Sequence, residues 1–245
     1  MSAIEARGAA LTYPDGTEAL RPLDLVVEPG EFVSLLGPSG CGKSTLLKLM
    51  AGLLAPSAGT LAVDRSRLAF VFQAPTLMPW ASVAANVRLP LDLLGAPRRR
   101  ADARVADALA LVGLDGVAAR LPRALSGGMQ MRVSIARALV MEPGLLLMDE
   151  PFGALDEITR HRLDTELLAL WRSRGLTVVF VTHSIHEAVF LSTRIVMMAA
   201  RPGRIVEELA VEEPYPRSQD FIVTPRFAAL ARRVQDSLVR ASGGA

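Results

Sequence analysis

A run of nine residues has the composition and spacing of a loop that binds polyphosphate. The run is Gly37, Pro38, Ser39, Gly40, Cys41, Gly42, Lys43, Ser44 and Thr45, and it fits G-x-x-x-x-G-K-[ST] at every fixed position. The glycines would leave backbone N–H groups open to an anion, the lysine would add a charge for the β- and γ-phosphates, and the first hydroxyl would contact Mg²⁺. An apolar run precedes the loop, and apolar residues at helical spacing follow it through Leu53, so the loop would lead into a helix N-terminus. A turn that binds nothing is the alternative, and the complete match in this context favours a nucleotide site.

Two adjacent acids, Asp149 and Glu150, follow the apolar run 145–148. A buried strand would present both carboxylates at its C-terminal end, which is where α/β sheets place their ligands. One carboxylate could hold Mg²⁺ through water, and the other could orient or deprotonate an attacking water. Strands that emerge into solvent also often end in acids. Together with the phosphate loop, the pair predicts a site for phosphoryl transfer.

Three further side chains stand at the ends of predicted strands. Gln73 follows the apolar run 68–72 and could contact a metal or water, although a surface glutamine is the commoner explanation. Tyr13 leads into a Pro-Asp-Gly turn and could stack on a base, although spacing alone favours a half-exposed strand tyrosine. His183 follows the strand 177–181 and could donate a hydrogen bond to a γ-phosphate.

A second possible anion site comes from Ser126, Gly127 and Gly128, which open a predicted helix and are followed by Gln130. Ser126 would be the N-cap, and the two glycines would bare the first backbone N–H groups of the helix. An ordinary helix entry explains the same residues equally well. Asp156, at the start of the next helical region, would be either an N-cap or a contact across an interface.

The remaining pattern predicts an α/β fold with a mainly parallel sheet, an N-terminal antiparallel β-subdomain and an inserted α-helical subdomain. Residues 4–28 would form antiparallel strands, a helix over 101–112 would end at Gly113, and residues from 194 would form two strands around a turn at 201–204. An amphipathic helix would follow Pro225, with a frayed tail over 242–245. We expect one domain over 1–245, with its core at about 1–75 and 141–210, helices at 76–140 and a C-terminal extension at 211–245.

Composition narrows the function classes. The chain has 245 residues, a formal net charge of +2 and a single cysteine, and it contains no apolar stretch of spanning length and no secretory signal pattern, so we expect a cytoplasmic location. The basic run 98–100 is more typical of a solvated helix entry than of a nucleic-acid patch. His161 and His186 fall in predicted helices and look structural, and no cluster has the spacing of a metal site.

The phosphate loop, Gln73, the segment 125–130, the acid pair, the segment 154–156 and His183 together resemble the ATP-binding-cassette ATPases, which share a P-loop NTPase core. The resemblance implies ATP and Mg²⁺ as ligands, with Tyr13 stacking on adenine, Ser44, Gln73 and Asp149 near the metal, Glu150 as general base and His183 on the γ-phosphate. It also implies a head-to-tail homodimer in the ATP-bound state, in which Ser126, Gly127 and Gly128 of one subunit close over the nucleotide of the other.

Within this family, the segments 76–80 and 200–205 look like the importer subgroup for nitrate, sulfonates and taurine. That likeness implies an ATPase on the cytoplasmic face of the membrane, with separate permease subunits and, indirectly, a solute-binding protein. The loop 73–80 would dock on the permease, unless Trp80 is buried within its own helical subdomain.

An ATPase acting on nucleic acid or ribosomes is the alternative, disfavoured by the single cassette and the lack of a broad basic face. A switch without turnover is disfavoured by Glu150. Met131 and the short segment 64–67 depart from the usual family pattern.

Overall fold

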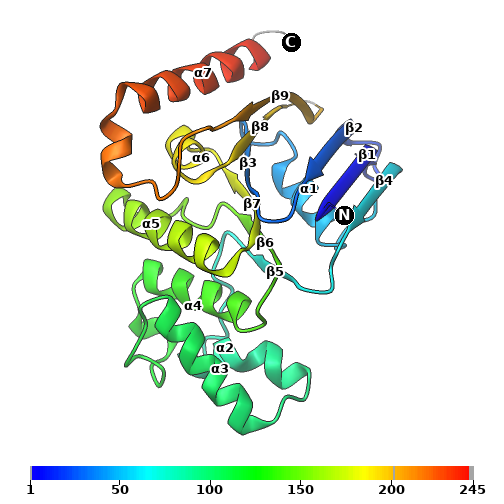
Figure 1. Ribbon diagram of the computed structural model, residues 1–245. Coiled ribbons are helices and arrows are strands. Elements are labelled where there is room, and N and C mark those ends of the chain that lie inside the picture. The colour runs from blue at the N-terminus through cyan, green and yellow to red at the C-terminus, as the bar shows by residue number, and fades with distance from the viewer. Residues whose placement is uncertain (1, 201, 243–245) are drawn as a thin grey trace.

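Strands that are apolar along their whole length form the centre of the molecule, as the sequence predicts. The computed structural model, which describes residues 2–200 and 202–242, has a six-stranded sheet in the order β5-β6-β7-β3-β8-β9 (Figure 1). The first five strands in this order are parallel, and β9 is antiparallel to β8. The bounds are β3 (Phe32–Leu36), β5 (Leu68–Val71), β6 (Leu145–Asp149), β7 (Thr177–Thr182), β8 (Arg194–Ala199) and β9 (Arg204–Ala210).

The predicted N-terminal antiparallel strands form a second sheet in the order β2-β1-β4. It contains β1 (Ile4–Thr12), β2 (Glu18–Val27) and β4 (Ala58–Val63), and β1 pairs antiparallel with both neighbours. The turn between β1 and β2 closes as expected, because Gly16 N–H donates to the Tyr13 carbonyl at 2.9 Å and Asp15 accepts from Thr17 N–H at 2.9 Å.

Helices complete the fold on both sides of the central sheet. They are α1 (Lys43–Met50), α2 (Val83–Leu93), α3 (Arg98–Leu111), α4 (Gly127–Leu139), α5 (Glu157–Arg174), α6 (Ile185–Leu191) and α7 (Pro225–Ser242), with short 3₁₀ turns η1 (Pro122–Ala124) and η2 (Gln219–Val223). α2, α3 and α4 lie between β5 and β6 in the chain and occupy the lower end of Figure 1. The proposed division of the chain at 75, 140 and 210 stays a prediction.

Alternate residues of the central strands serve two apolar cores. In β3, Phe32 and Leu36 face a core shared with helices α2 to α7, whereas Val33 and Leu35 face a core shared with α1 and the antiparallel sheet. This period of two, with apolar residues in both registers, is why the strand reads as a continuous hydrophobic run. The sheet is therefore held rigidly between two layers, and its C-terminal edge can carry side chains in fixed positions.

Most predicted helix boundaries are confirmed, and one is wrong. Gly113 follows α3 with φ of 64°, in the left-handed conformation expected after a helix end. The helix after the phosphate loop, however, ends at Met50, and Leu53 is 59% exposed instead of continuing the apolar face. Gly52, with φ of 74°, turns the chain away, and the Arg65 guanidinium donates to the carbonyls of Leu49 and Met50 at the helix end.

The segment after β9 is anchored by a buried arginine, Arg217, which no local sequence pattern singles out. The guanidinium of Arg217 donates to the carbonyls of Val189, Phe190 and Ser192, at the C-terminal end of α6. It also lies 4.1 Å from the centre of the Tyr215 ring. α7 then packs back on the molecule as an amphipathic helix, as predicted. Arg201 of the predicted turn and residues 243–245 of the predicted frayed tail lie outside the described residues.

α5 buries a carboxyl group without a hydrogen-bond partner. Asp164 is 1% exposed, and within the described chain neither of its carboxyl oxygens is hydrogen-bonded. Burial, with a smaller contribution from Glu187, raises the pKa of Asp164 to about 8, against the opposing charge of Arg160. At neutral pH this carboxyl is therefore mostly protonated.

We expect Asp164→Asn to gain stability relative to the wild type as pH rises. The folded-state pKa of Asp164 lies above the ~3.9 of an unfolded aspartate. The stability that the proton confers on the wild type is therefore fully present below pH ~3.9 and is lost as pH rises towards 8. The difference between the variant and the wild type should grow by at least about 1 kcal/mol between pH 5 and 8, or about 2–4 °C in Tm. Thermal unfolding at the two pH values measures it. Asp107→Asn, on an exposed position of α3, is the control, and equal differences at both pH values would contradict a neutral Asp164.

Candidate active site

The predicted phosphate loop connects β3 to α1, and its glycines are required by the protein's own backbone. A Cβ at Gly37 would lie 2.4 Å from the Met198 carbonyl oxygen, and one at Gly42 would lie 2.5 Å from Leu20 Cδ2. Gly40 and Gly42 also have φ of 77° and 89°, which side chains rarely adopt. Among the three glycines of this loop, Gly40 alone would have no atom within 4 Å of an added Cβ. The absence of side chains therefore serves close packing at Gly37 and Gly42, in addition to keeping the loop open.

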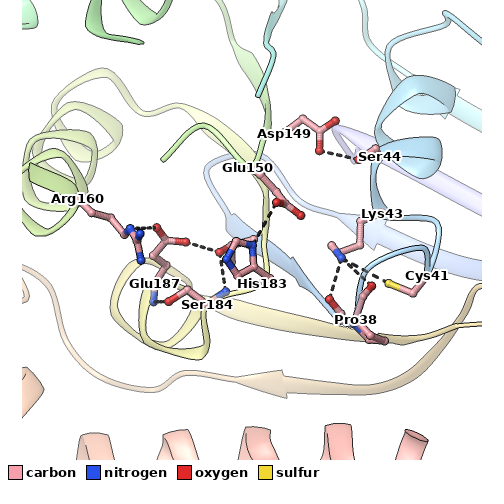
Figure 2. Close-up of polar contacts among 12 residues, drawn as sticks. Pro38, Cys41, Lys43, Ser44, Asp149, Glu150, Arg160, His183, Ser184 and Glu187 are labelled. Carbon is pink, nitrogen blue, oxygen red and sulfur yellow. Dashed lines mark hydrogen bonds and ion pairs between the residues drawn. The ribbon is translucent and has the colours of Figure 1, made fainter. Parts of the chain in front are cut away.

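The Lys43 ammonium lies inside this loop. Its Nζ donates to the carbonyls of Gly37 at 2.8 Å and Pro38 at 3.0 Å and lies 3.7 Å from Cys41 Sγ, and the residue is only 5% exposed (Figure 2). Burial raises the pKa of the Cys41 thiol, so the sulfur is a neutral neighbour. A positive charge is thus concentrated where the loop would surround a polyphosphate.

Ser44 and Asp149 meet across the gap between α1 and β6. The Ser44 hydroxyl donates to Asp149 Oδ1 at 2.8 Å. Burial raises the pKa of Asp149, while the hydrogen bond from Ser44 opposes that rise. A hydroxyl and a carboxylate in contact are hard oxygen donors of the kind that Mg²⁺ takes beside substrate phosphates. No group of three or more His, Cys, Asp or Glu side chains forms a metal site in the described part of the chain, so the remaining ligands would be phosphate and water.

Glu150 is turned away from its neighbour Asp149 by an unusual backbone conformation. Its φ is 43°, and its N–H donates to the Val181 carbonyl at 3.0 Å. The side chain consequently points at His183, whose Nδ1 lies 3.1 Å from Glu150 Oε2 (Figure 2). Non-glycine residues in the left-handed region are strained and cluster at functional sites. The two adjacent acids thereby reach different partners.

One cavity of about 540 Å³ adjoins most of these groups. Its wall includes Tyr13, residues 39–45 of the loop, Gln73 and Glu150, so the structure gathers these residues from four separate parts of the chain. Sequence reasoning missed Thr17, Glu18 and Ala19, and also Pro202 and Gly203 after β8. Gly203 packs so closely on the loop that a Cβ would lie 2.5 Å from the Cys41 carbonyl oxygen. No local pattern connects positions 41 and 203, so sequence spacing offered no signal for them.

The residues of the second predicted anion site lie together elsewhere and do not line this cavity. Ser126 caps α4 by accepting from Met129 N–H at 3.3 Å, and Asp156 caps α5 by accepting from Thr159 N–H at 2.9 Å. The N-termini of the two helices are in contact, because a Cβ at Gly128 would lie 2.9 Å from Thr159 Cγ2. The Gln130 amide donates to the carbonyls of Pro122 and Leu125, within its own loop.

A parallel sheet with a phosphate loop after one strand and an acid pair at the end of another defines a P-loop NTPase. The family model described as ABC transporter matches residues 20–153. An aliphatic sulfonates import ATP-binding protein of Pseudomonas syringae is 46% identical over 217 residues, covering 88% of this chain and 89% of that protein. An ABC transporter ATP-binding protein of Methanocaldococcus jannaschii is 45% identical, covering 84% and 79%. The chain belongs to the ABC transporter family and is an ATP-binding ATPase subunit.

Solved structures agree with this assignment. CbiO1 of Clostridium perfringens, described as part of an ABC transporter complex, has a TM-score of 0.80 at 27% identity, covering 94% of this chain and 99% of that one. An ATP-binding cassette solved as a dimer after hydrolysis, with bound ADP and Pi, has a TM-score of 0.77 at 33% identity, covering 86% and 100%. The expected α/β fold class is therefore confirmed.

Lys43→Ala and Glu150→Gln should separate binding from turnover. Removing the buried ammonium should weaken ATP binding at least about tenfold, since loss of a charge-assisted contact costs about 1.5–3 kcal/mol. Glu150→Gln should leave the Kd for Mg-ATP within about twofold and reduce kcat by ~10²–10⁴-fold, as removal of a general base does. Equilibrium titration and phosphate release measure the two effects. Lys48→Ala, which removes an exposed cation from the same helix, is the control. Equal loss of binding in both variants would contradict these roles.

Proposed function

We propose that this subunit hydrolyses ATP to drive uptake of a small solute, of the nitrate, sulfonate or taurine type, through separate membrane subunits. The observation that carries the catalytic part is the contact between Glu150 and His183 beside the phosphate loop. The transport part rests on relatives named for the import of aliphatic sulfonates, among them proteins of Pseudomonas syringae and Bacillus licheniformis.

The site residues divide the work of hydrolysis among themselves. Lys43 would compensate the charge of the β- and γ-phosphates from within the loop, and Tyr13, at the cavity wall, would stack on the base. Glu150 would take the proton of the attacking water, and His183 would hold its carboxylate in place and contact the γ-phosphate. Ser44, Asp149 and Gln73 would hold Mg²⁺, which supplies charge neutralisation on the phosphates.

A complete site requires a second copy of the chain. The N–H groups of Gly127 and Gly128 have no hydrogen-bond partner within the described residues, and Ser126 and Gly127 are exposed. These groups suit a γ-phosphate, yet they do not line the cavity that contains the phosphate loop of their own chain. We infer that ATP joins two copies head to tail, each supplying Ser126, Gly127 and Gly128 to the nucleotide on the other.

Mixing two inactive variants tests this arrangement. Ser126→Glu should bind ATP nearly as the wild type but block closure and turnover, because its carboxylate would repel the γ-phosphate of the partner's nucleotide. Lys43→Ala should lose ATP binding. In the mixed dimer, one site has an intact loop and an intact Ser126, so phosphate release should partly recover. Specific activity of the wild type should also rise with protein concentration. Constant specific activity from a demonstrated monomer would contradict the composite site.

The loop 73–80 is built to present Trp80 outward. Asn86 of α2 accepts from Met78 N–H at 2.7 Å, and Arg137 of α4 donates to the Pro75 and Thr76 carbonyls, each at 2.9 Å. Trp80 is 78% exposed, so the expectation that it could be buried within its own helices is wrong. The loop begins at Gln73 on the cavity wall and ends at this indole, which suits it to report the nucleotide to a membrane partner.

No helix in the described part of the chain is long and apolar enough to cross a bilayer. We therefore place the transport path in partner permease subunits, with this chain bound peripherally at the cytoplasmic face and a solute-binding protein acting through the permease. The exposed indole of Trp80 is the side chain we assign to a permease helix.

Trp80→Ala should reduce assembly with the permease while leaving the subunit folded and able to bind ATP. Loss of a large aromatic anchor at an interface typically costs at least ~2 kcal/mol, or about thirtyfold in Kd. Co-purification and quantitative binding to the permease in detergent measure the effect. Val223→Ala, which removes an equally exposed apolar side chain from η2, is the control. Undiminished assembly and transport by a folded Trp80→Ala subunit would exclude the docking role.

A further inference from the structure

A buried ion pair connects the helix that follows Asp156 to the helix that follows His183. The guanidinium Nε of Arg160, on α5, lies 3.6 Å from Glu187 Oε1, on α6 (Figure 2). Glu187 is 4% exposed, so its carboxylate pairs inside the protein and not in solvent. Removing Arg160 is costly, because it leaves the Glu187 carboxylate as an unpaired buried charge.

Glu187 fixes the turn that carries His183. The Thr182 hydroxyl donates to Glu187 Oε2, and the same hydroxyl oxygen accepts from Ser184 N–H at 2.9 Å. The Ser184 hydroxyl in turn accepts from Glu187 N–H at 3.3 Å, capping α6. Both neighbours of His183 are thus hydrogen-bonded to Glu187: Thr182 to its carboxylate and Ser184 to its backbone N–H.

Arg160 extends this connection to the start of α5. Its Nη2 donates to the Leu155 carbonyl at 2.8 Å, directly before the N-cap Asp156. The Leu155 side chain lies against the N-terminus of α4, 3.8 Å from where a Cβ of Gly127 would be. A continuous series of contacts therefore starts at the glycines of α4 and passes through Leu155 and Arg160 to Glu187. From Glu187 it reaches the turn that holds His183 against Glu150.

The two buried acids beside Arg160 have different partners. Arg160 faces both Glu187 and the buried Asp164, and burial raises the pKa of each acid. Glu187 has the hydrogen bond from Thr182 and the ion pair with Arg160, whereas Asp164 has no hydrogen bond in the described chain. The arrangement therefore commits Arg160 to Glu187, with Asp164 as a neutral neighbour.

We propose that Glu187 is a positioning residue for ATP hydrolysis, which holds the His183 turn in place and, through Arg160, makes its position depend on the start of α5. Glu187 does not touch the cavity itself, so it acts through His183. The proposal rests on the proposed roles of Glu150 and His183. It predicts that removing the ion pair lowers the turnover rate and leaves the affinity for ATP unchanged.

A double-mutant cycle with His183 tests this role. Glu187→Gln keeps an oxygen that can accept from Thr182 but loses the charge that pairs with Arg160, and it should lower kcat about tenfold with KM for ATP unchanged within twofold. In a His183→Gln background, the same substitution should change the residual single-turnover rate less than twofold, because the residue it positions is gone. An equal loss in both backgrounds, or a loss confined to KM, would overturn the proposal. Arg162→Gln, exposed on α5, is the control.

Arg160→Gln tests the link to α5 and provides a second variant. It should lower kcat severalfold, and adding Glu187→Gln to it should cost less than a further twofold, whereas Arg160→Lys should retain most of the activity. Independent, multiplicative losses would overturn the part assigned to Arg160.

Amide hydrogen exchange gives a readout that does not depend on activity. Glu187→Gln should speed exchange at the Ser184 amide at least tenfold relative to the wild type, because a neutral amide oxygen accepts from Thr182 more weakly than a carboxylate does. Arg162→Gln should leave this exchange unchanged. Unchanged exchange at Ser184 would contradict the proposal. Glu150→Gln is measured alongside: full turnover by that variant would refute the proposed catalytic base, irrespective of the result for Glu187.

Discussion

Burial of one ammonium group in a tight loop is the constraint on which the catalytic edge depends. Lys43 has its charge within the loop that precedes it, bonded to the carbonyls of Gly37 and Pro38. A charge with so little exposure needs oxygen atoms close by, and the loop supplies them from its own backbone carbonyls. The loop in turn packs on Met198 and Gly203, at the end of β8 and in the turn beyond. The position of β8 and β9 is therefore part of the nucleotide site, although neither strand has a catalytic side chain.

The second constraint is that two neighbouring acids contact different partners. Along an extended strand, Asp149 and Glu150 would point to opposite faces of the sheet. The left-handed backbone at Glu150 changes this simple alternation, so that Asp149 reaches Ser44 on α1 and Glu150 reaches His183 beyond β7. The strain is offset by regular structure on both sides, because β6 is paired with β5 and β7 along its length. A rigid parallel sheet thus supports one strained peptide where the chemistry requires it.

Local patterns predicted those parts of the molecule that local chemistry determines. The loop after β3, the caps at Ser126 and Asp156, and the antiparallel pair β1 and β2 follow from glycine, capping residues and a Pro-Asp-Gly turn, each acting over a few positions. The central strands β3, β6 and β7 were recognisable because they are apolar on both faces. The contacts that were missed join distant positions: Gly203 on Cys41, Arg217 on the end of α6, and Arg160 on Glu187. An arginine in a sequence gives no sign of whether it will be solvated or buried, because that depends on which carbonyls or carboxylates the fold brings near it.

The contact between α4 and α5 has a mechanical consequence for a shared site. Gly128 lies against Thr159 with no room for a side chain between them, so the N-terminus of α4 packs directly on the start of α5. A phosphate drawn to the free N–H groups of α4 in one copy would therefore press on the start of α5 in that same copy, at Leu155 and Asp156. Arg160 bonds to the Leu155 carbonyl and pairs with Glu187, so the displacement would be felt at the turn before His183. In the proposed dimer, capture of a partner's nucleotide at one end of this series would thus be coupled, through packed and hydrogen-bonded groups, to the geometry of Glu150, the proposed general base, at the other end.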